Sequence, residues 1–140
     1  MALFIGESDE RYIAQQRGSR AEEWGRRAEE IAVEYLISQG VPITERRWRV
    51  GRLELDIISQ QGDEMVFIEV KSRLGKYENP EDAITAEKIK RIVRAADAYL
   101  KSQEHDFYAR FDVVLVEGDE KNHTVSYIRD AFYPPLTTRR

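Results

Sequence analysis

The sequence predicts an α/β domain in which a central mixed β-sheet of about five strands is flanked by helices. Three observations support this fold class. Residues 53–73 alternate as two β-strands around a Gly-Asp turn, segments with helical periodicity precede and follow this hairpin, and strongly β-forming residues follow the second helix. The order α-β-β-β-α-β-β implies a crossover through the second helix, which makes a later strand parallel to a hairpin strand.

The composition is that of a soluble globular protein. The chain has 140 residues, of which 41% are hydrophobic and 34% are charged, and this suits one domain, expected over residues 19–140. There is no cysteine, which excludes disulfides and thiolate metal sites. The N-terminus has no signal-peptide pattern and no apolar run approaches the ~18 residues of a membrane span, so a cytoplasmic location is expected.

The N-terminal segment is predicted to divide into an arm and a helix. Residues 1–18 show no clear periodicity and are expected to form an irregular or mobile arm. A helix is predicted over 19–38, because Ser19 and Glu22 match a capping box and Gly40 stands just past the helix end.

The hairpin over residues 53–73 is the element around which the domain is organised, and a first strand is predicted just before it, over 43–50. Its turn is Gly62-Asp63, a two-residue connection with glycine first, as a type II′ turn prefers. This turn fixes the register of the two strands and gives the hairpin one apolar face. We expect the second helix to cover that face, which consists of Leu53, Leu55, Ile57, Val66, Ile68 and Val70.

The opposite face of the hairpin places Asp56 directly across from Glu69, with Lys71 two residues further on. Facing carboxylates are normally destabilising unless a cation lies between them. Neighbouring strands are about 4.8 Å apart, and Mg²⁺ commonly binds one or two protein carboxylates, so both side chains can reach one ion. Lys71, about 7 Å along the strand, lies close to a metal-bound water. The pattern indicates a metal-dependent hydrolytic site, although a half-exposed hairpin has a polar face in any case.

The acidic face is expected to look toward the first helix and the open side of the sheet. On that helix, Glu29 lies at the edge of the apolar stripe. Its carboxylate either turns to solvent or lies against the polar face of the hairpin, and helical periodicity does not choose between the two.

Two basic groups flank the acidic centre. One precedes the hairpin, where four arginines surround Trp48, and the other lies on the second helix. Although the net charge of −4 is the wrong sign for a protein that binds nucleic acid over its whole surface, local basic groups can hold a polyanion at its phosphates. The alternative for either group is a solvated charged face. The residues predicted to contact nucleic acid are Arg46, Arg47, Arg49, Arg73, Lys88 and Arg91.

The remaining elements follow the hairpin in order. A loop over 74–82 is the natural lid or substrate-contacting segment. A helix is predicted over 85–102, and strands are predicted over 109–117 and 123–129.

Three residues in these last elements are predicted to have structural roles. Asp112 alternates with apolar residues in its strand. It can reach the polar layer of the site, but the favoured interpretation is that it pairs with Arg110 or Arg73 as structural support. Phe132 and Tyr133 in the tail are both expected to pack against the domain.

Several motifs in order along the chain resemble the YraN-type uncharacterised protein family. They are Gly25-x-x-Ala28-Glu29-x-x-Ala32, Glu54-Leu55-Asp56-Ile57-Ile58, Phe67-Ile68-Glu69-Val70-Lys71-Ser72-Arg73, Thr85-x-x-Lys88 and Arg110-Phe111-Asp112-Val113. The closing Asp130-Ala131-Phe132-Tyr133-Pro134-Pro135 looks like the Bacteroidetes branch of that family. The family is similar in fold to restriction endonucleases and archaeal Holliday-junction resolvases, so the resemblance implies a restriction-endonuclease-like core.

The resemblance also implies a magnesium site. Carried over by motif, Asp56, Glu69 and Glu29 are the implied metal ligands, and Lys71 matches the catalytic lysine. The backbone carbonyl of Val70 is expected to join Asp56 and Glu69 at the metal, and Glu29 to orient a metal-bound water or contact a second ion. Related resolvases are dimers, yet nothing in this sequence defines a dimer interface.

Two functions from different classes are consistent with these residues. The first is a Mg²⁺- or Mn²⁺-dependent endonuclease that acts on DNA phosphodiester bonds, with structured or branched DNA as a candidate substrate. The alternative is a non-catalytic nucleic-acid-binding protein that retains a nuclease-like scaffold. A third hypothesis is a protein-interaction module that uses the sheet edge or the Phe132-Tyr133-Pro134-Pro135 tail.

Overall fold

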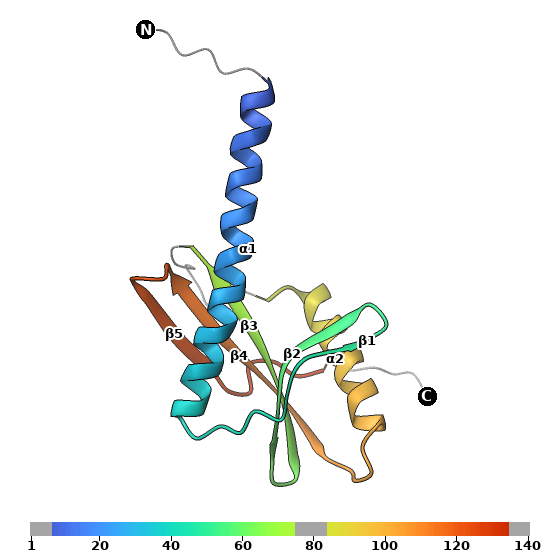
Figure 1. Ribbon diagram of the computed structural model, residues 1–140. Helices are drawn as coiled ribbons and strands as arrows, with labels where there is room; N and C mark the ends of the chain where they lie inside the picture. The colour runs from blue at the N-terminus through green and yellow to red at the C-terminus, as the bar shows by residue number, and fades with distance from the viewer. Residues whose placement is uncertain (1–6, 75–83, 135–140) are drawn as a thin grey trace, which may run out of the picture.

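A five-stranded mixed sheet lies between two helices, as the sequence predicts (Figure 1). The computed structural model describes residues 7–74 and 84–134. The strands follow the order β1-β2-β3-β4-β5 across the sheet; β3 and β4 are parallel and the other neighbours are antiparallel. The elements are α1 (Glu7–Ser38), β1 (Glu45–Val50), β2 (Leu53–Gln61), β3 (Glu64–Arg73), α2 (Ala86–Lys101), β4 (Tyr108–Gly118) and β5 (His123–Ile128).

Helix α1 is longer than the sequence pattern indicates. It begins at Glu7, so the prediction of an irregular arm over residues 1–18 is wrong from Glu7 onward, and the predicted start at Ser19 lies within the helix. The cause is that an apolar stripe reports burial, and among residues 20–38, whose burial is described, the first buried residue is Trp24. The earlier turns extend away from the sheet (Figure 1), and they contain no proline to stop the helix.

The predicted hairpin register is confirmed over most of its length. Gln61 pairs with Glu64, Ser59 with Val66 and Ile57 with Ile68, all as expected from a turn at Gly62-Asp63. Gly62 has φ 62°, the positive value that the first central residue of a type II′ turn requires. The paired residues of β2 and β3 end at Ile57 and Ile68, one position before the expected pair of Asp56 and Glu69.

The two helices pack on the faces opposite to those expected. The face with Ile57, Val66 and Ile68 packs against α1, in a core that also contains Ala28, Ala32 and Leu36. The other face packs against α2 around Phe67. The prediction that the second helix covers the apolar hairpin face is therefore wrong. The reason is that neither face of the sheet is polar throughout; the α2 side carries Ile58, Met65, Phe67 and Phe111.

Strand alternation also breaks near the middle of β2. Leu55 packs with the α2 cluster, whereas Ile57, two residues on, packs with the α1 cluster. In the neighbouring strand, Arg47 has φ 51° and lies between the paired positions Arg46 with Ile57 and Trp48 with Leu55. Arg47 departs from the extended backbone beside the break in β2, so simple alternation fails at this point of the sheet.

Helix α2 begins at a well-defined cap. The Thr85 hydroxyl accepts a hydrogen bond from the backbone N–H of Lys88 (3.1 Å), and the helix ends before Ser102, close to the predicted bounds. Its buried residues are Ile92, Ala95, Ala96 and Tyr99. The loop predicted to contact substrate lies almost entirely outside the described residues.

The two aromatic residues of the tail differ in their packing. Phe132 stacks on Phe111 with ring centroids 5.2 Å apart, as expected. Tyr133 is 74% exposed, so the prediction that it packs is wrong. None of the helices in residues 7–74 and 84–134 is both long enough and apolar enough to cross a membrane.

Candidate active site

The centre of the site is the pair of carboxylates Asp56 on β2 and Glu69 on β3. They lie one position beyond Ile57 and Ile68, where the pairing of the two strands ends. Asp56 Oδ2 accepts a hydrogen bond from the backbone N–H of Val70 at 2.9 Å. The side chain of Asp56 thus connects β2 to β3 just beyond the last paired residues of the two strands. The Glu69 side chain is only 7% exposed. The two acids predicted to face each other are therefore close together and largely withdrawn from water.

Burial raises the pKa of both acids, and the charge of a neighbouring carboxylate raises each of them further. The pKa of Asp56 is raised mainly by burial and further by the charge of Glu29, against the lowering effect of the Val70 N–H. The pKa of Glu69 is raised to about 8, first by burial and then by the charge of Asp56. Two neighbouring carboxylates in a low-dielectric setting resist ionising together, so the pair needs either a proton or a cation.

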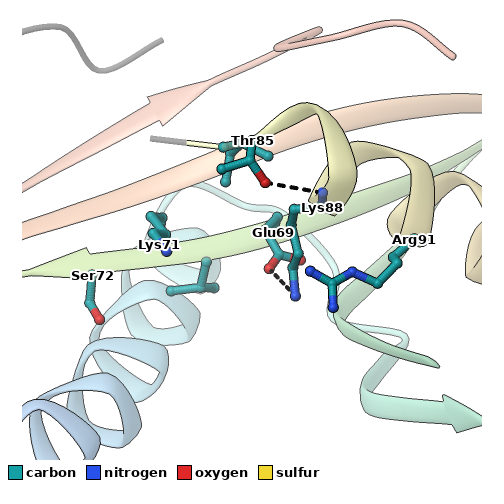
Figure 2. Close-up of a pocket in the computed structure, with 8 residues that line it drawn as sticks. Glu69, Lys71, Ser72, Thr85, Lys88 and Arg91 are labelled. Carbon is teal, nitrogen blue, oxygen red and sulfur yellow. Dashed lines mark hydrogen bonds and ion pairs between the residues drawn. The ribbon is translucent and has the colours of Figure 1, made fainter. Parts of the chain in front are cut away.

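Lys88 supplies a cation to this pair. Its Nζ lies 3.3 Å from Glu69 Oε1, and its charge lowers the pKa of both Glu69 and Asp56. Figure 2 shows the side-chain ends of Lys88 and Arg91 directed toward Glu69. These groups open onto a cavity of about 300 Å³ between β3 and the start of α2. Its lining consists of Glu69, Val70, Lys71, Ser72, Ile84, Thr85, Lys88 and Arg91.

Lys71, the predicted catalytic lysine, lines the same cavity two residues beyond Glu69 on β3 (Figure 2). It is partly buried. Within residues 7–74 and 84–134 no ion pair is found for its ammonium group, in contrast to Lys88. Lys71 is thus placed to face whatever enters the cavity, while Lys88 holds the acid.

Glu29 is held against the sheet and does not turn to solvent, which settles the alternative that periodicity leaves open. Its side chain is 15% exposed, and its Oε1 lies 2.9 Å from Arg47 Nε and 3.4 Å from Arg46 Nη2. Arg46 also bonds Glu30 at 2.7 Å. Glu29 therefore lies near enough to Asp56 to raise its pKa, but arginines already balance its charge.

The six predicted nucleic-acid contacts divide into different environments. Arg46 and Arg47 are engaged by acids of α1, as described above. Arg49 is 72% exposed and lies 3.2 Å from Glu54. Arg73 is exposed at the end of β3. Lys88 and Arg91 line the cavity beside the acids, so the cationic surface nearest to the centre belongs to α2 and β3.

The donor set can be compared with what a divalent ion requires. In the described part of the chain, no group of three or more His, Cys, Asp or Glu side chains is arranged to hold a metal, so Glu29 does not form such a group with the pair in this conformation. Mg²⁺ usually binds through only one or two protein carboxylates and keeps several waters. Asp56, Glu69 and the carbonyl of Val70 match that requirement in chemistry, because the buried acids repel each other without a cation.

The contact between Lys88 and Glu69 is the part of the site that sequence reasoning missed. Lys88 is predicted as a nucleic-acid contact and not as a member of the acidic centre. A signal for it exists: a helix that follows a strand in a crossover begins near the carboxyl end of that strand, and Thr85-x-x-Lys88 sets the helix start. Glu69 lies toward that end of β3, so Lys88 is brought over it.

These features define an α/β protein with a five-stranded mixed sheet and paired acids between two of its strands, an arrangement consistent with a nuclease-like core. The chain belongs to the uncharacterised protein family UPF0102, whose model matches residues 28–116. This is the YraN family, so the predicted family is confirmed.

Relatives from several bacteria support the same assignment. A UPF0102 protein of Phocaeicola vulgatus is 43% identical over 115 residues, which cover 81% of this chain and 95% of that protein. One from Bacteroides thetaiotaomicron is 45% identical over the same length and coverage. One from Chlorobium chlorochromatii is 39% identical over 118 residues, 79% of this chain and 92% of the relative. The identities of the Bacteroidetes relatives fit the predicted branch.

Proposed function

We propose that this protein is a magnesium-dependent endonuclease that acts on phosphodiester bonds of DNA, with structured or branched DNA as the candidate substrate class. The observation that carries the proposal is the pair of partly buried Asp56 and buried Glu69, in which burial first and the charge of Asp56 second raise the pKa of Glu69 to about 8. Such perturbed carboxylates beside a cationic cavity are typical of functional sites.

In this proposal Asp56, Glu69 and the Val70 carbonyl hold Mg²⁺ or Mn²⁺. A bound divalent ion supplies Lewis-acid activation of water and neutralises charge on the phosphate. Asp56 keeps its hydrogen bond from the Val70 N–H, which fixes the orientation of its carboxylate. The two acids thus provide an anionic binding site on adjacent strands.

Lys71 is the residue proposed to act on the attacking water. It lines the cavity next to Glu69, where its ammonium can donate a hydrogen bond to a water and offset charge that builds on the phosphate. Glu29 is proposed to orient a water from the α1 side or to contact a second ion, a role that requires it to loosen its contact with Arg47.

DNA is proposed to approach over the cavity between β3 and α2. Lys71, Lys88 and Arg91 line it, and backbone phosphates are the groups that such cations bind without regard to sequence. Arg49 and Arg73 are exposed and can extend the contact. Arg46 and Arg47 are held by Glu29 and Glu30 of α1.

Asp56→Asn is expected to abolish metal binding and cleavage together. Because even outer-shell changes weaken metal sites about 10- to 100-fold, loss of an inner carboxylate should weaken binding of Mn²⁺ at least about 100-fold. The measurement is calorimetric titration with Mn²⁺, paired with cleavage assays on duplex, flap and four-way-junction DNA. Asp63→Asn, in the exposed hairpin turn, is the matched control and should leave both unchanged.

Two outcomes would reject the endonuclease. If wild type binds neither Mg²⁺ nor Mn²⁺ at millimolar concentration, the metal site is wrong. If salt-dependent DNA binding persists in Asp56→Asn and wild type cleaves none of the substrates, the non-catalytic nucleic-acid-binding protein is the better description. The cations in the cavity favour that second candidate, because they do not depend on a metal.

A further inference from the structure

We infer that Lys88 is an internal counter-ion of the Asp56–Glu69 pair, which a divalent cation displaces when it binds and which is then free to contact a phosphate. The inference deepens the proposed function and depends on its metal site. It adds an exchange to that site: the same lysine holds a carboxylate in the metal-free protein and faces the substrate in the metal-bound one.

The first support is geometric. Lys88 Nζ lies 3.3 Å from Glu69 Oε1, and this carboxylate is almost completely buried. The charge of Lys88 acts on Asp56 as well as on Glu69. One cation therefore serves both acids, as a metal between them would. Within residues 7–74 and 84–134, Glu69 forms its ion pair with Lys88.

The second support is the balance of charge. When both acids are ionised, the pair carries two negative charges, and a single lysine balances one of them. A divalent ion balances both. If the lysine and the metal were held together, three positive charges would face two negative ones at short range, so each cation weakens the binding of the other.

The third support is the position of Lys88 in α2. Thr85 caps the helix and bonds the Lys88 N–H, so Lys88 lies in the first turn. A cation is unfavourable there, because the helix N-terminus already carries partial positive charge. The placement of Lys88 is thus explained by its acidic partner across the cavity and not by the helix itself.

Lys88 can also make the exchange without movement of the helix. Its side chain is 41% exposed, and its ammonium group is carried on a flexible four-carbon stem. Lys71 and Arg91 line the same cavity, so an ammonium released from Glu69 joins two other cations that face the same space (Figure 2). The three would then hold the anionic substrate next to the metal.

Lys88→Met is expected to bind Mn²⁺ about tenfold more tightly than wild type at pH 8, which corresponds to about 1.4 kcal/mol. The measurement is calorimetric titration of the purified full-length protein, without DNA. Lys90→Met is the matched control: it removes a lysine from the exposed side of the same helix and should leave the affinity unchanged.

Equal or weaker binding by Lys88→Met would overturn the counter-ion role while leaving the metal site in place. No binding by wild type and by Lys88→Met alike would overturn both the inference and the proposed function, so the two failures are distinct.

A second measurement needs no variant and decides the question if Lys88→Met fails to fold. Lysines of the wild-type protein are acetylated with a water-soluble succinimidyl ester, with and without saturating Mn²⁺, and the rates at single sites are read by mass spectrometry. We expect Mn²⁺ to raise the rate at Lys88 about threefold or more relative to Lys90, because the freed amine is no longer held by a carboxylate. An unchanged ratio would contradict the exchange.

Discussion

Glu69→Gln is expected to make the metal-free protein more stable than wild type at pH 9 and equally stable near pH 4. The reason is that burial and the charge of Asp56 raise the pKa of Glu69 from 4.5 to about 8. Between these two values the folded protein keeps a proton on Glu69, while the unfolded chain releases it. The free energy of unfolding of wild type therefore falls as pH rises through this window, and glutamine removes the fall.

The expected size is considerable for one buried group. A tenfold change in proton affinity corresponds to about 1.4 kcal/mol, so Glu69→Gln should exceed wild type at pH 9 by roughly 2–4 kcal/mol. The measurement is urea unfolding in EDTA buffer from pH 4 to pH 9. Saturating Mg²⁺ should raise the stability of wild type at pH 9 but not that of the variant, because a bound cation takes the place of the proton.

The matched control for this prediction is Glu104→Gln, at an exposed position beyond the end of α2. Its stability should follow that of wild type at every pH. If Glu69→Gln also runs parallel to wild type, then Glu69 ionises normally in the folded protein. The two acids would then not constrain each other, and the argument for a cation between them would lose its basis.

The hairpin could be predicted from the sequence because its signals are local. Gly62-Asp63 defines the turn, and period-two alternation defines the pairing from Ile57 with Ile68 to the turn. The same rule cannot report where the pairing of β2 with β3 stops, because there the side chain of Asp56 accepts a hydrogen bond from the Val70 N–H, a contact that alternation does not encode. The alternation nevertheless predicts the positions of Asp56 and Glu69, because each lies only one position beyond the last pair, Ile57 with Ile68.

The parts that were not predicted depend on contacts between distant segments. An amphipathic stripe shows that a helix packs against a sheet. It does not show which face the helix covers when both faces of the sheet are apolar, so the predicted face for the second helix is wrong. The helix start at Glu7 lies well before the apolar stripe that begins at Trp24, so the stripe does not report it. The contact of Glu29 with Arg47 joins residues 18 positions apart, beyond any periodicity.

Among the polar residues outside the site, Asp112 was predicted as structural support paired with Arg110 or Arg73, and its pairing with Arg110 is confirmed. Asp112 is completely buried on β4. Its carboxylate accepts bonds from Arg110 Nε at 3.0 Å and Nη2 at 2.9 Å, from the Tyr127 hydroxyl at 2.5 Å and from the Asp130 N–H at 3.0 Å. One acid thus joins β4, β5 and the start of the tail.

Asp112→Ala is expected to destabilise the protein by about 3 kcal/mol, because it removes the buried carboxylate from the largely buried Arg110 guanidinium, which keeps only the more exposed Glu64 at 3.2 Å as an anionic partner. Tyr127, whose pKa burial and Asp112 raise to about 12, would lose its acceptor as well. The measurement is the free energy of urea unfolding at pH 7.

Asp97→Asn provides the control for Asp112→Ala, because Asp97 forms an exposed ion pair with Lys101 at 2.8 Å, and its loss should change stability by about 0.5 kcal/mol or less. The comparison distinguishes a buried ion pair that stabilises the fold from an exposed ion pair on a helix surface that contributes little. A loss below about 1 kcal/mol in Asp112→Ala would mean that water or a neighbouring side chain replaces the carboxylate. The fully bonded Asp112 and the mutually repelling Asp56 and Glu69 lie in the same sheet, so only the second group has a reason to bind something from outside.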